Sequence, residues 1–137
     1  MLSRQVLLDT DTLSAYMRRE ATVVARIEEY LIAHRELSFS LMTRYEILRG
    51  LKARGATSKL RAFAELCSIS DILALTDEVI ERAADVYADL YRRGELIGEG
   101  DILIASTALV YDLVMVTNNV KHFSRIADLQ VDNWLQA

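Results

Sequence analysis

The sequence predicts an α/β fold with a mostly parallel central sheet of about five short strands, flanked by helices. Helical segments alternate with short apolar segments along the chain, which is typical of parallel sheets. The short segments are continuously apolar, as in strands that are buried on both faces. The 137 residues include no proline and few glycines, and no window is repeated or of low complexity. This composition predicts a single domain over residues 1–137.

Five short apolar runs are the predicted strands, and the first of them stops abruptly at Asp9. Spacings of three and four residues predict helices between them, with Val24, Ile27 and Leu31 facing inward in the second helix. The same spacing places Tyr45 inward in the third helix, which Ser40 or Thr43 caps. The strands are expected at residues 6–9, 37–40, 72–75, 113–117 and 129–131. The helices are expected at 12–19, 21–33, 43–54, 57–67, 77–93 and 101–111, with a short helical turn at 119–126.

Charge and cysteine content limit the possible classes of protein. The net charge of −4 argues against a generally basic nucleic-acid-binding surface. Between Arg44 and Arg61, however, basic residues clearly outnumber the acids, which is either a phosphate-binding face or the solvated face of a helix. Cys67 has no partner cysteine, which favours a reducing compartment. No run is long enough for a signal peptide or a membrane span, so we expect a cytoplasmic protein without membrane contact.

Four polar residues lie where a predicted strand ends or a predicted helix begins: Asp9, Glu46, Asp101 and Asn119. In a parallel sheet the residues that follow the strands gather at one edge, so these side chains are expected to converge there. Each acid also has a simpler interpretation. Asp9 and Asp101 are suited to capping the helices that follow them, and Glu46 can pair with Arg49. Capping gives no reason for Glu46, which favours a common site.

A carboxylate cluster of this kind is suited to a divalent metal ion. Several carboxylates in a partly dry cleft repel one another unless a cation is present. Mg²⁺ and Mn²⁺ prefer oxygen ligands, and a metal-activated water can hydrolyse a phosphodiester bond. No Cys–His or Ser–His pair offers another active site, and we expect His34 and His122 to be surface residues.

Four motifs follow one another along nearly the whole chain. They are Leu7-Leu8-Asp9-Thr10-Asp11, Thr43-Arg44-Tyr45-Glu46-Ile47-Leu48-Arg49-Gly50, Gly100-Asp101-Ile102-Leu103-Ile104-Ala105, and Val116-Thr117-Asn118-Asn119 with Phe123, and the tail Val131-Asp132-Asn133-Trp134 follows. Together they resemble the PIN-domain ribonucleases, in particular the VapC toxins of bacterial toxin–antitoxin pairs. The resemblance implies a three-layer PIN-like fold and an Mg²⁺-dependent endoribonuclease toxin of a type II system, with Mn²⁺ as a substitute metal.

The resemblance also implies roles for individual residues. Asp9, Glu46 and Asp101 would surround the metal, with Asp9 and Asp101 as its direct ligands. Many members carry a fourth acid where Asn119 stands, so we expect Asn119 to hold a metal-bound water or a phosphate oxygen, and one metal to be firmly bound. Asp11 stands where many members carry Asn, which leaves its role open.

The implied partners are RNA, often a structured RNA such as tRNA, a VapB-like antitoxin, and a second copy of the chain. The antitoxin would place an apolar helix in a groove and a basic side chain among the carboxylates. The residues expected to contact RNA are Arg44, Arg49, Lys52, Arg54 and Thr117.

Two alternatives belong to other classes. The run from Leu8 to Leu13 also matches the Asp-x-Asp-x-Thr loop of haloacid-dehalogenase-type phosphatases, in which Asp9 would be the nucleophile and Asp11 the general acid. That mechanism needs a downstream acidic pair, and Asp101 is followed only by apolar residues. The second alternative is a non-catalytic PIN-fold interaction module, which would have no need for three converging acids.

Overall fold

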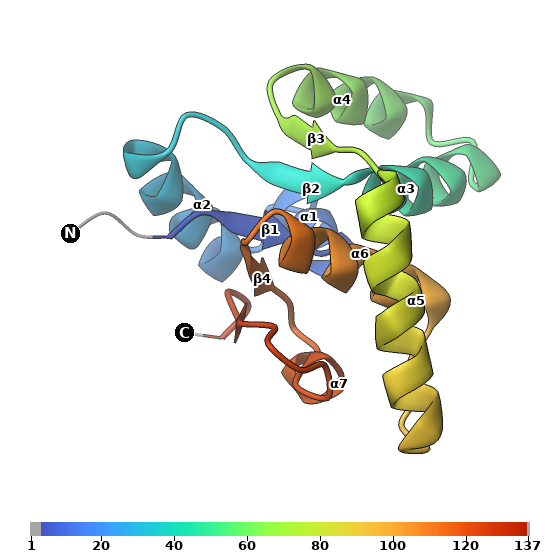
Figure 1. The fold of residues 1–137 in the computed structure, drawn as a ribbon. Helices are drawn as coiled ribbons and strands as arrows, with labels where there is room; N and C mark the ends of the chain where they lie inside the picture. Colours follow the sequence, from blue (N-terminus) through green and yellow to red (C-terminus); the bar gives the residue numbers. More distant parts are fainter. Residues whose placement is uncertain (1–3, 137) are drawn as a thin grey trace.

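The computed structural model describes residues 4–136 and has three layers, a parallel sheet between two layers of helices (Figure 1). The predicted domain, 1–137, includes residues 1–3 and 137, which lie outside this range. In the described part, no helix is long and apolar enough to cross a membrane. The elements are β1 (Val6–Leu8), α1 (Thr10–Met17), α2 (Ala21–Ala33), β2 (Ser38–Ser40), α3 (Leu41–Ala53), α4 (Thr57–Ser68), β3 (Asp71–Leu73), α5 (Asp77–Arg92), α6 (Glu99–Val110), β4 (Val114–Val116), α7 (Val120–Phe123) and β5 (Val131–Asp132).

All strand pairs in the sheet are parallel, which confirms the predicted fold class. β1 pairs with β4, where Leu7 lies opposite Met115, and β4 pairs with β5. β2 pairs with β3. Hydrogen bonds join the strands into a three-stranded part, β1-β4-β5, and a two-stranded part, β2-β3, and because β1 and β2 lie side by side the spatial order is β3-β2-β1-β4-β5. The chain therefore leaves every strand at the same edge, where Asp9 follows β1.

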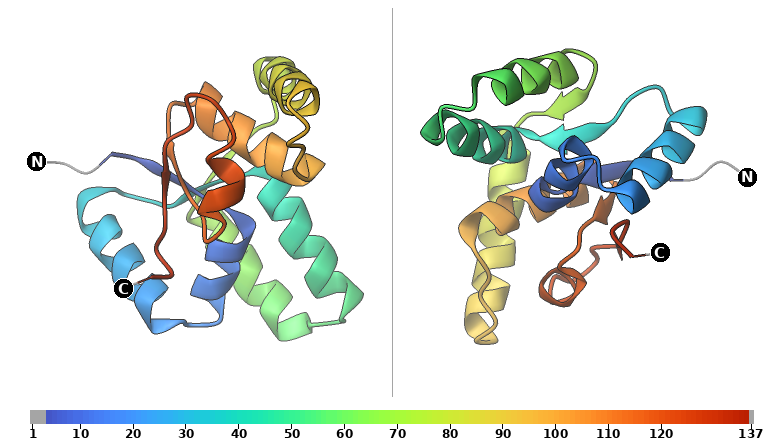
Figure 2. Two further views of the ribbon diagram at one scale, coloured as in Figure 1. Left: turned by 90° about the horizontal axis from the view of Figure 1, so that it is seen from below. Right: turned by 180° about the vertical axis from the view of Figure 1, so that it is seen from behind.

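The sheet divides the apolar residues into two cores. Alternate residues of a strand face opposite sides, so Val6 and Leu8 of β1 pack with α1 to α4. Leu7 of β1 and Met115 of β4 pack with α5, α6 and α7 on the other side. Figure 2 shows the arrangement of the helices about the sheet from two further directions. Both faces are covered, which is why the strands are continuously apolar.

Several predicted helix faces and boundaries were wrong. α2 buries Val23, Ile27 and Tyr30, while Leu31 is exposed. In α3 the buried residues are Thr43, Ile47 and Leu51, and Tyr45 points to solvent. The apolar spacing alone did not determine which of two neighbouring stripes packs on the sheet. α6 begins at Glu99 with Gly98 as its N-cap, so Asp101 lies inside the first turn and does not cap the helix.

Candidate active site

Asp9 is a buried carboxylate at the end of β1, with 5% of its surface exposed. It is the N-cap of α1, and its Oδ1 accepts a hydrogen bond of 2.8 Å from the Thr12 N–H. Burial raises the pKa of Asp9 to about 6, although hydrogen bonds from Thr117 and Thr12 oppose the rise. The charge of Asp11 raises this pKa further. Asp9 therefore caps a helix and is also a candidate site residue, so the two interpretations do not exclude each other.

Glu46 reaches the site from α3, which Ser40 caps through a hydrogen bond of 3.1 Å from the Thr43 N–H. The Thr10 hydroxyl at the start of α1 donates a hydrogen bond of 2.5 Å to Glu46 Oε1. Arg49 lies at the limit of an ion pair, 4.0 Å from Glu46 Oε2, and its side chain is 58% exposed. Such an exposed pair contributes little. Thr10 is therefore the better-defined partner of Glu46.

Gly100 allows α6 to approach Glu46 closely. A Cβ atom at this position would lie 2.7 Å from Glu46 Oε2 and 3.1 Å from Met42 Cε. Both distances are shorter than side chains normally tolerate, so a larger residue would displace Glu46 or α6. The absence of a side chain at Gly100 thus allows Asp101 and Glu46 to lie near each other.

Asp101 is half-buried, and its pKa is raised, first by burial and then by the charge of Glu46. Asp11 raises it as well, whereas His122 lowers it. Asp11 is exposed in the first turn of α1, so its charge acts on both Asp9 and Asp101. Glu46 and Asp11 both act on Asp101, and Asp11 also acts on Asp9, so we call Asp9, Asp11, Glu46 and Asp101 the acid cluster.

Asn119, the fourth predicted residue, lies between β4 and α7. Its N–H donates to Thr117 Oγ1 (2.9 Å), and its Nδ2 contacts His122 Nδ1 (2.8 Å). Because His122 is half-buried and acts electrostatically on Asp101, it belongs to the surroundings of the site. The prediction that His122 is a surface residue was wrong, and in the sequence only its position three residues after Asn119 indicates a place near the site.

The carboxylates of the acid cluster are chemically suited to a divalent ion. Carboxylate oxygens are the hard donors that Mg²⁺ and Mn²⁺ prefer. Within residues 4–136, no three acidic, histidine or cysteine side chains are grouped closely enough to bind one ion. Asp9 and Asp101 as ligands, with water and substrate phosphate completing the shell, match the way Mg²⁺ is commonly bound.

The predicted RNA-contacting residues do not form one patch. Arg44 hydrogen-bonds Cys67 of α4, and its charge lowers the pKa of that thiol against the larger effect of burial. The Arg49 guanidinium lies 5.2 Å from the centre of the Tyr45 ring. Lys52 is exposed, whereas Thr117 is fully buried.

Arg54 lines a groove of about 500 Å³ between α1, α3 and α4, which we call the α1–α3–α4 groove. Thr10 and Glu46 also line it, so the groove opens onto the acid cluster. Its basic side chains are Arg18, Arg19, Arg54 and Lys59, and its apolar ones include Met17, Ile47, Leu51 and Leu66. The contribution of Arg18 and Arg19 was not predicted, because they are distant in sequence from the basic stretch.

The family model described as PIN domain matches residues 6–129 of the chain. The chain belongs to the PIN-domain family. Ribonuclease VapC10 of Mycobacterium tuberculosis (strain CDC 1551 / Oshkosh) is 32% identical over 128 residues, which cover 91% of this PIN domain chain and 90% of the relative. Ribonuclease VapC1 of Haemophilus influenzae (strain R2866) is 28% identical over 129 residues, covering 93% and 96% of the two chains.

Solved structures of VapC-type proteins share the fold of this PIN domain. DNA-bound VapBC from Salmonella typhimurium matches with a TM-score of 0.85 and 25% identity, covering 98% of this chain and 99% of that one. VapBC2 from Rickettsia felis, bound to a promoter DNA fragment, matches with a TM-score of 0.82 and 25% identity, covering 94% of this chain and 98% of that one. The predicted resemblance to VapC proteins is confirmed, and the family assignment contradicts the phosphatase alternative.

Proposed function

We propose that this PIN domain is a metal-dependent endoribonuclease and the toxin of a type II toxin–antitoxin system, acting in the cytoplasm. The observation that carries the proposal is the acid cluster, in which the charge of Glu46 acts on Asp101 and the charge of Asp11 acts on both Asp9 and Asp101. Gly100 allows the close approach of α6 to Glu46, and the pKa values of Asp9 and Asp101 are both raised. Carboxylates that burial and mutual repulsion destabilise are suited to a cation. The names of the relatives, which are ribonucleases, support the same conclusion.

We propose Mg²⁺, with Mn²⁺ as a substitute, held by Asp9 and Asp101. When bound, the ion would neutralise charge on the scissile phosphate and lower the pKa of an attacking water. The side chains of this chain provide the positioning. Thr10 orients the Glu46 carboxylate through a hydrogen bond, and Thr117 orients Asp9 in the same way. Asn119 adds no charge, so a single firmly held metal is expected.

RNA is the proposed substrate, and a structured RNA such as tRNA follows from the family resemblance. Cleavage through a metal-activated water does not itself require a ribose 2′-hydroxyl, so the choice of RNA over DNA must be measured. Arg49 beside Glu46 and Arg54 in the α1–α3–α4 groove are placed to meet the RNA backbone.

The proposed partner of the α1–α3–α4 groove is a VapB-like antitoxin. An amphipathic helix would cover the apolar lining of the groove, such as Met17 and Leu66. Because Glu46 also lines the groove, a basic side chain of the partner would meet the acid cluster there. The structures of VapBC complexes support a VapB-like partner for this chain.

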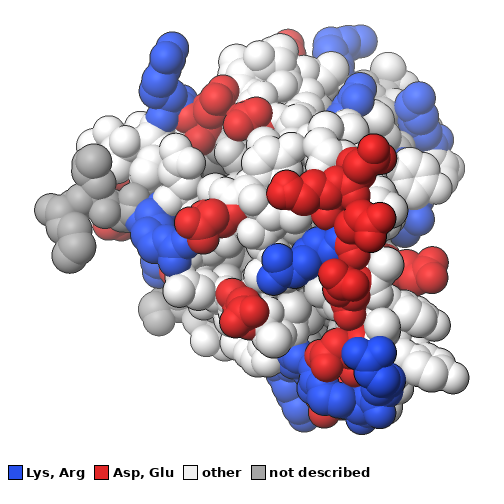
Figure 3. All heavy atoms as spheres, in the orientation of Figure 1, with Lys and Arg blue, Asp and Glu red and all other residues white. Residues whose placement is uncertain are grey.

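A second copy of the chain is the proposed partner of α5. One face of α5 carries exposed residues at spacings of four, three and four, as in a coiled-coil seam. These residues form the α5 stripe: Ile80, Ala84, Tyr87 and Tyr91. Acidic side chains run along α5, and basic side chains gather at its C-terminal end (Figure 3). An antiparallel second copy would place Ile80 opposite the partner's Tyr91 and Glu78 beside the partner's Arg92, which is self-complementary.

The test uses the purified full chain, labelled RNA and matched variants. We expect Mg²⁺-dependent cleavage that chelation stops, and a loss of at least about 100-fold in Asp9→Asn, Glu46→Gln and Asp101→Asn. The control Asp112→Asn changes an exposed acid paired with Arg4 and should cleave normally. Sequencing of the 5′-phosphate RNA ends after induced expression, with wild type and Asp9→Asn, identifies the substrate.

Four results would contradict the proposal. Full activity in chelator would exclude the metal, and equal cleavage of DNA would exclude RNA specificity. Growth arrest by Asp9→Asn, or a wild type that binds the antitoxin but never cleaves, would favour the non-catalytic module.

A further inference from the structure

A continuous chain of polar contacts runs from Asp9 to His122. Thr117 hydrogen-bonds the Asp9 carboxylate, and its Oγ1 accepts the N–H of Asn119. The Asn119 side chain then contacts His122 Nδ1 at 2.8 Å. His122 lowers the pKa of Asp101, so the chain returns to the second proposed metal ligand. None of the roles considered above uses His122.

The contact with Asn119 determines which ring nitrogen of His122 can donate. The Asn119 Nδ2 amide group can only donate, so in the neutral imidazole Nδ1 accepts and the ring proton lies on Nε2. Within residues 4–136, the His122 side chain hydrogen-bonds Asn119, and no ion pair joins His122 to Asp101. The Nε2–H group is therefore available to an acceptor from outside the chain.

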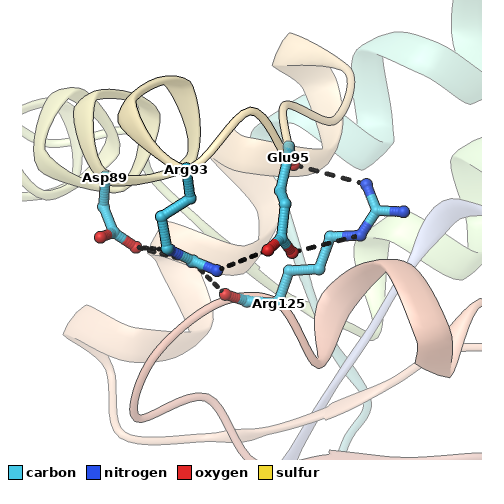
Figure 4. A network of polar contacts seen from close by, with 4 residues as sticks. All are labelled: Asp89, Arg93, Glu95 and Arg125. Atoms are coloured by element: carbon cyan, nitrogen blue, oxygen red, sulfur yellow. Dashed lines mark hydrogen bonds and ion pairs between the residues drawn. The ribbon is translucent and has the colours of Figure 1, made fainter.

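α7, which carries His122, is a four-residue helix and would not be stable alone. Phe123 anchors it in the core that contains α6. A polar network holds the residues that follow (Figure 4). Arg93 donates to the Arg125 carbonyl (2.6 Å), and Arg125 contacts the carboxylate of Glu95 (3.9 Å).

This network fixes α7 relative to the start of α6. Glu95 lies between α5 and α6 and also pairs with Arg93 at 3.3 Å, while Arg93 pairs with Asp89 at 2.7 Å. The network thereby connects the loop that leads to Asp101 with the segment that follows His122. Individual exposed ion pairs are weak, but here backbone and side-chain contacts act together on two short segments. The segment that carries His122 is consequently fixed relative to the start of α6 before any ligand binds, which favours a role in binding.

We propose that His122 donates its Nε2–H to a non-bridging oxygen of the scissile phosphate, beside Asp101. The proposal rests on the function proposed above and adds a residue to that site. The negative charges of the acid cluster repel a phosphate unless other groups offset them. An imidazole donor at this edge supplies a hydrogen bond to the phosphate, and Asn119 orients that donor. Asn119 is then the residue that positions His122.

The alternative is that the contact between Asn119 and His122 only stabilises α7, and two substitutions separate these roles. His122→Asn keeps an acceptor near the position of Nδ1 but lacks a donor at the position of Nε2, whereas His122→Gln can present an amide donor there. Ser124→Ala is the matched control, because Ser124 is exposed and directly follows α7. The measurements are kcat and KM for RNA cleavage with Mg²⁺, thermal unfolding, and RNA affinity in the Asp9→Asn background.

We expect His122→Ala and His122→Asn to lose about 10- to 100-fold in kcat/KM, the effect of one charge-assisted hydrogen bond. His122→Gln should recover part of the loss, and RNA affinity should fall in the His122→Asn variant of the inactive background. The unfolding temperature of His122→Asn should stay within about 2 °C of wild type. If wild type cleaves RNA, Asp9→Asn does not, and His122→Asn cleaves like wild type, then the role of His122 is excluded while the proposed function stands. A wild type that does not cleave RNA would overturn the proposed function.

Discussion

Replacing Gly100 by alanine tests whether the close approach of α6 to Glu46 is needed. The new Cβ would lie 2.7 Å from Glu46 Oε2, and Thr10 already holds the other oxygen of this carboxylate. Alanine is about 1 kcal/mol more favourable than glycine inside a helix. An extra methyl group in a packed contact costs about 1–3 kcal/mol. The free energy of unfolding should therefore stay unchanged or fall by up to about 2 kcal/mol, with Glu46 displaced.

Gly50→Ala in α3 is the matched comparison for stability. Its Cβ would lie 3.5 Å from Arg54 Nη1, an ordinary contact, so this variant gains helix propensity without a clash. We expect it to be about 1 kcal/mol more stable than wild type, which raises the unfolding temperature by about 3 °C. The free energy of unfolding should therefore rise in Gly50→Ala and stay unchanged or fall in Gly100→Ala.

Thermal unfolding in chelator and RNA cleavage in Mg²⁺ measure the two effects separately. A displacement of about 1 Å at an active site can reduce the rate about 100-fold, and we expect a loss of this size in kcat/KM for Gly100→Ala. Glu46→Gln provides the reference for a site without this carboxylate charge. If Gly100→Ala gains as much stability as Gly50→Ala and cleaves RNA like wild type, the spacing argument is wrong.

Three other predictions concern pH, the groove and α5. Because the pKa of Asp9 is about 6 in the folded chain against 3.8, the stability that Asp9 contributes is present below pH 3.8 and lost as the pH rises through about 6. Asp9→Asn should remove this loss of about 3 kcal/mol, so without metal its free energy of unfolding in urea at pH 7.5 should exceed that of wild type. Mg²⁺ should raise the unfolding temperature of wild type and leave that of Asp9→Asn unchanged. Reversing the charges of Arg54 and Lys59 should weaken RNA binding and reduce its salt dependence, and unchanged binding would mean that the groove does not meet phosphates. Tyr91→Glu should shift the chain to a monomer in light scattering, whereas the same dimer in Tyr91→Glu would exclude the α5 stripe.

The strand ends and the acids could be predicted from the sequence because their signal is local. Asp9 stops an apolar run, and a buried parallel strand is continuously apolar whatever surrounds it. A parallel sheet then brings Asp9 and Asn119 to one edge without further information. The order of the four motifs along the chain indicated the resemblance to the PIN-domain family.

Contacts between distant elements could not be predicted in this way. The role of Gly100 depends on Glu46, which lies on another helix, and a glycine between polar residues resembles an ordinary loop residue. His122 is in a polar segment, and nothing local shows that α7 folds back toward Asp101. The inner face of α3 was misassigned because Tyr45 and Ile47 are both apolar and only packing on the sheet distinguishes them.

The α1–α3–α4 groove and the acid cluster share Thr10 and Glu46, so occupants of the two places cannot be independent. A helix that fills the groove would cover one side of Glu46, whose other side faces Gly100. A basic side chain there would neutralise the carboxylates, as a metal ion would, and the two cations would repel each other at this distance. Antitoxin binding and metal binding should therefore weaken each other by the same factor, because coupling between two ligands is reciprocal.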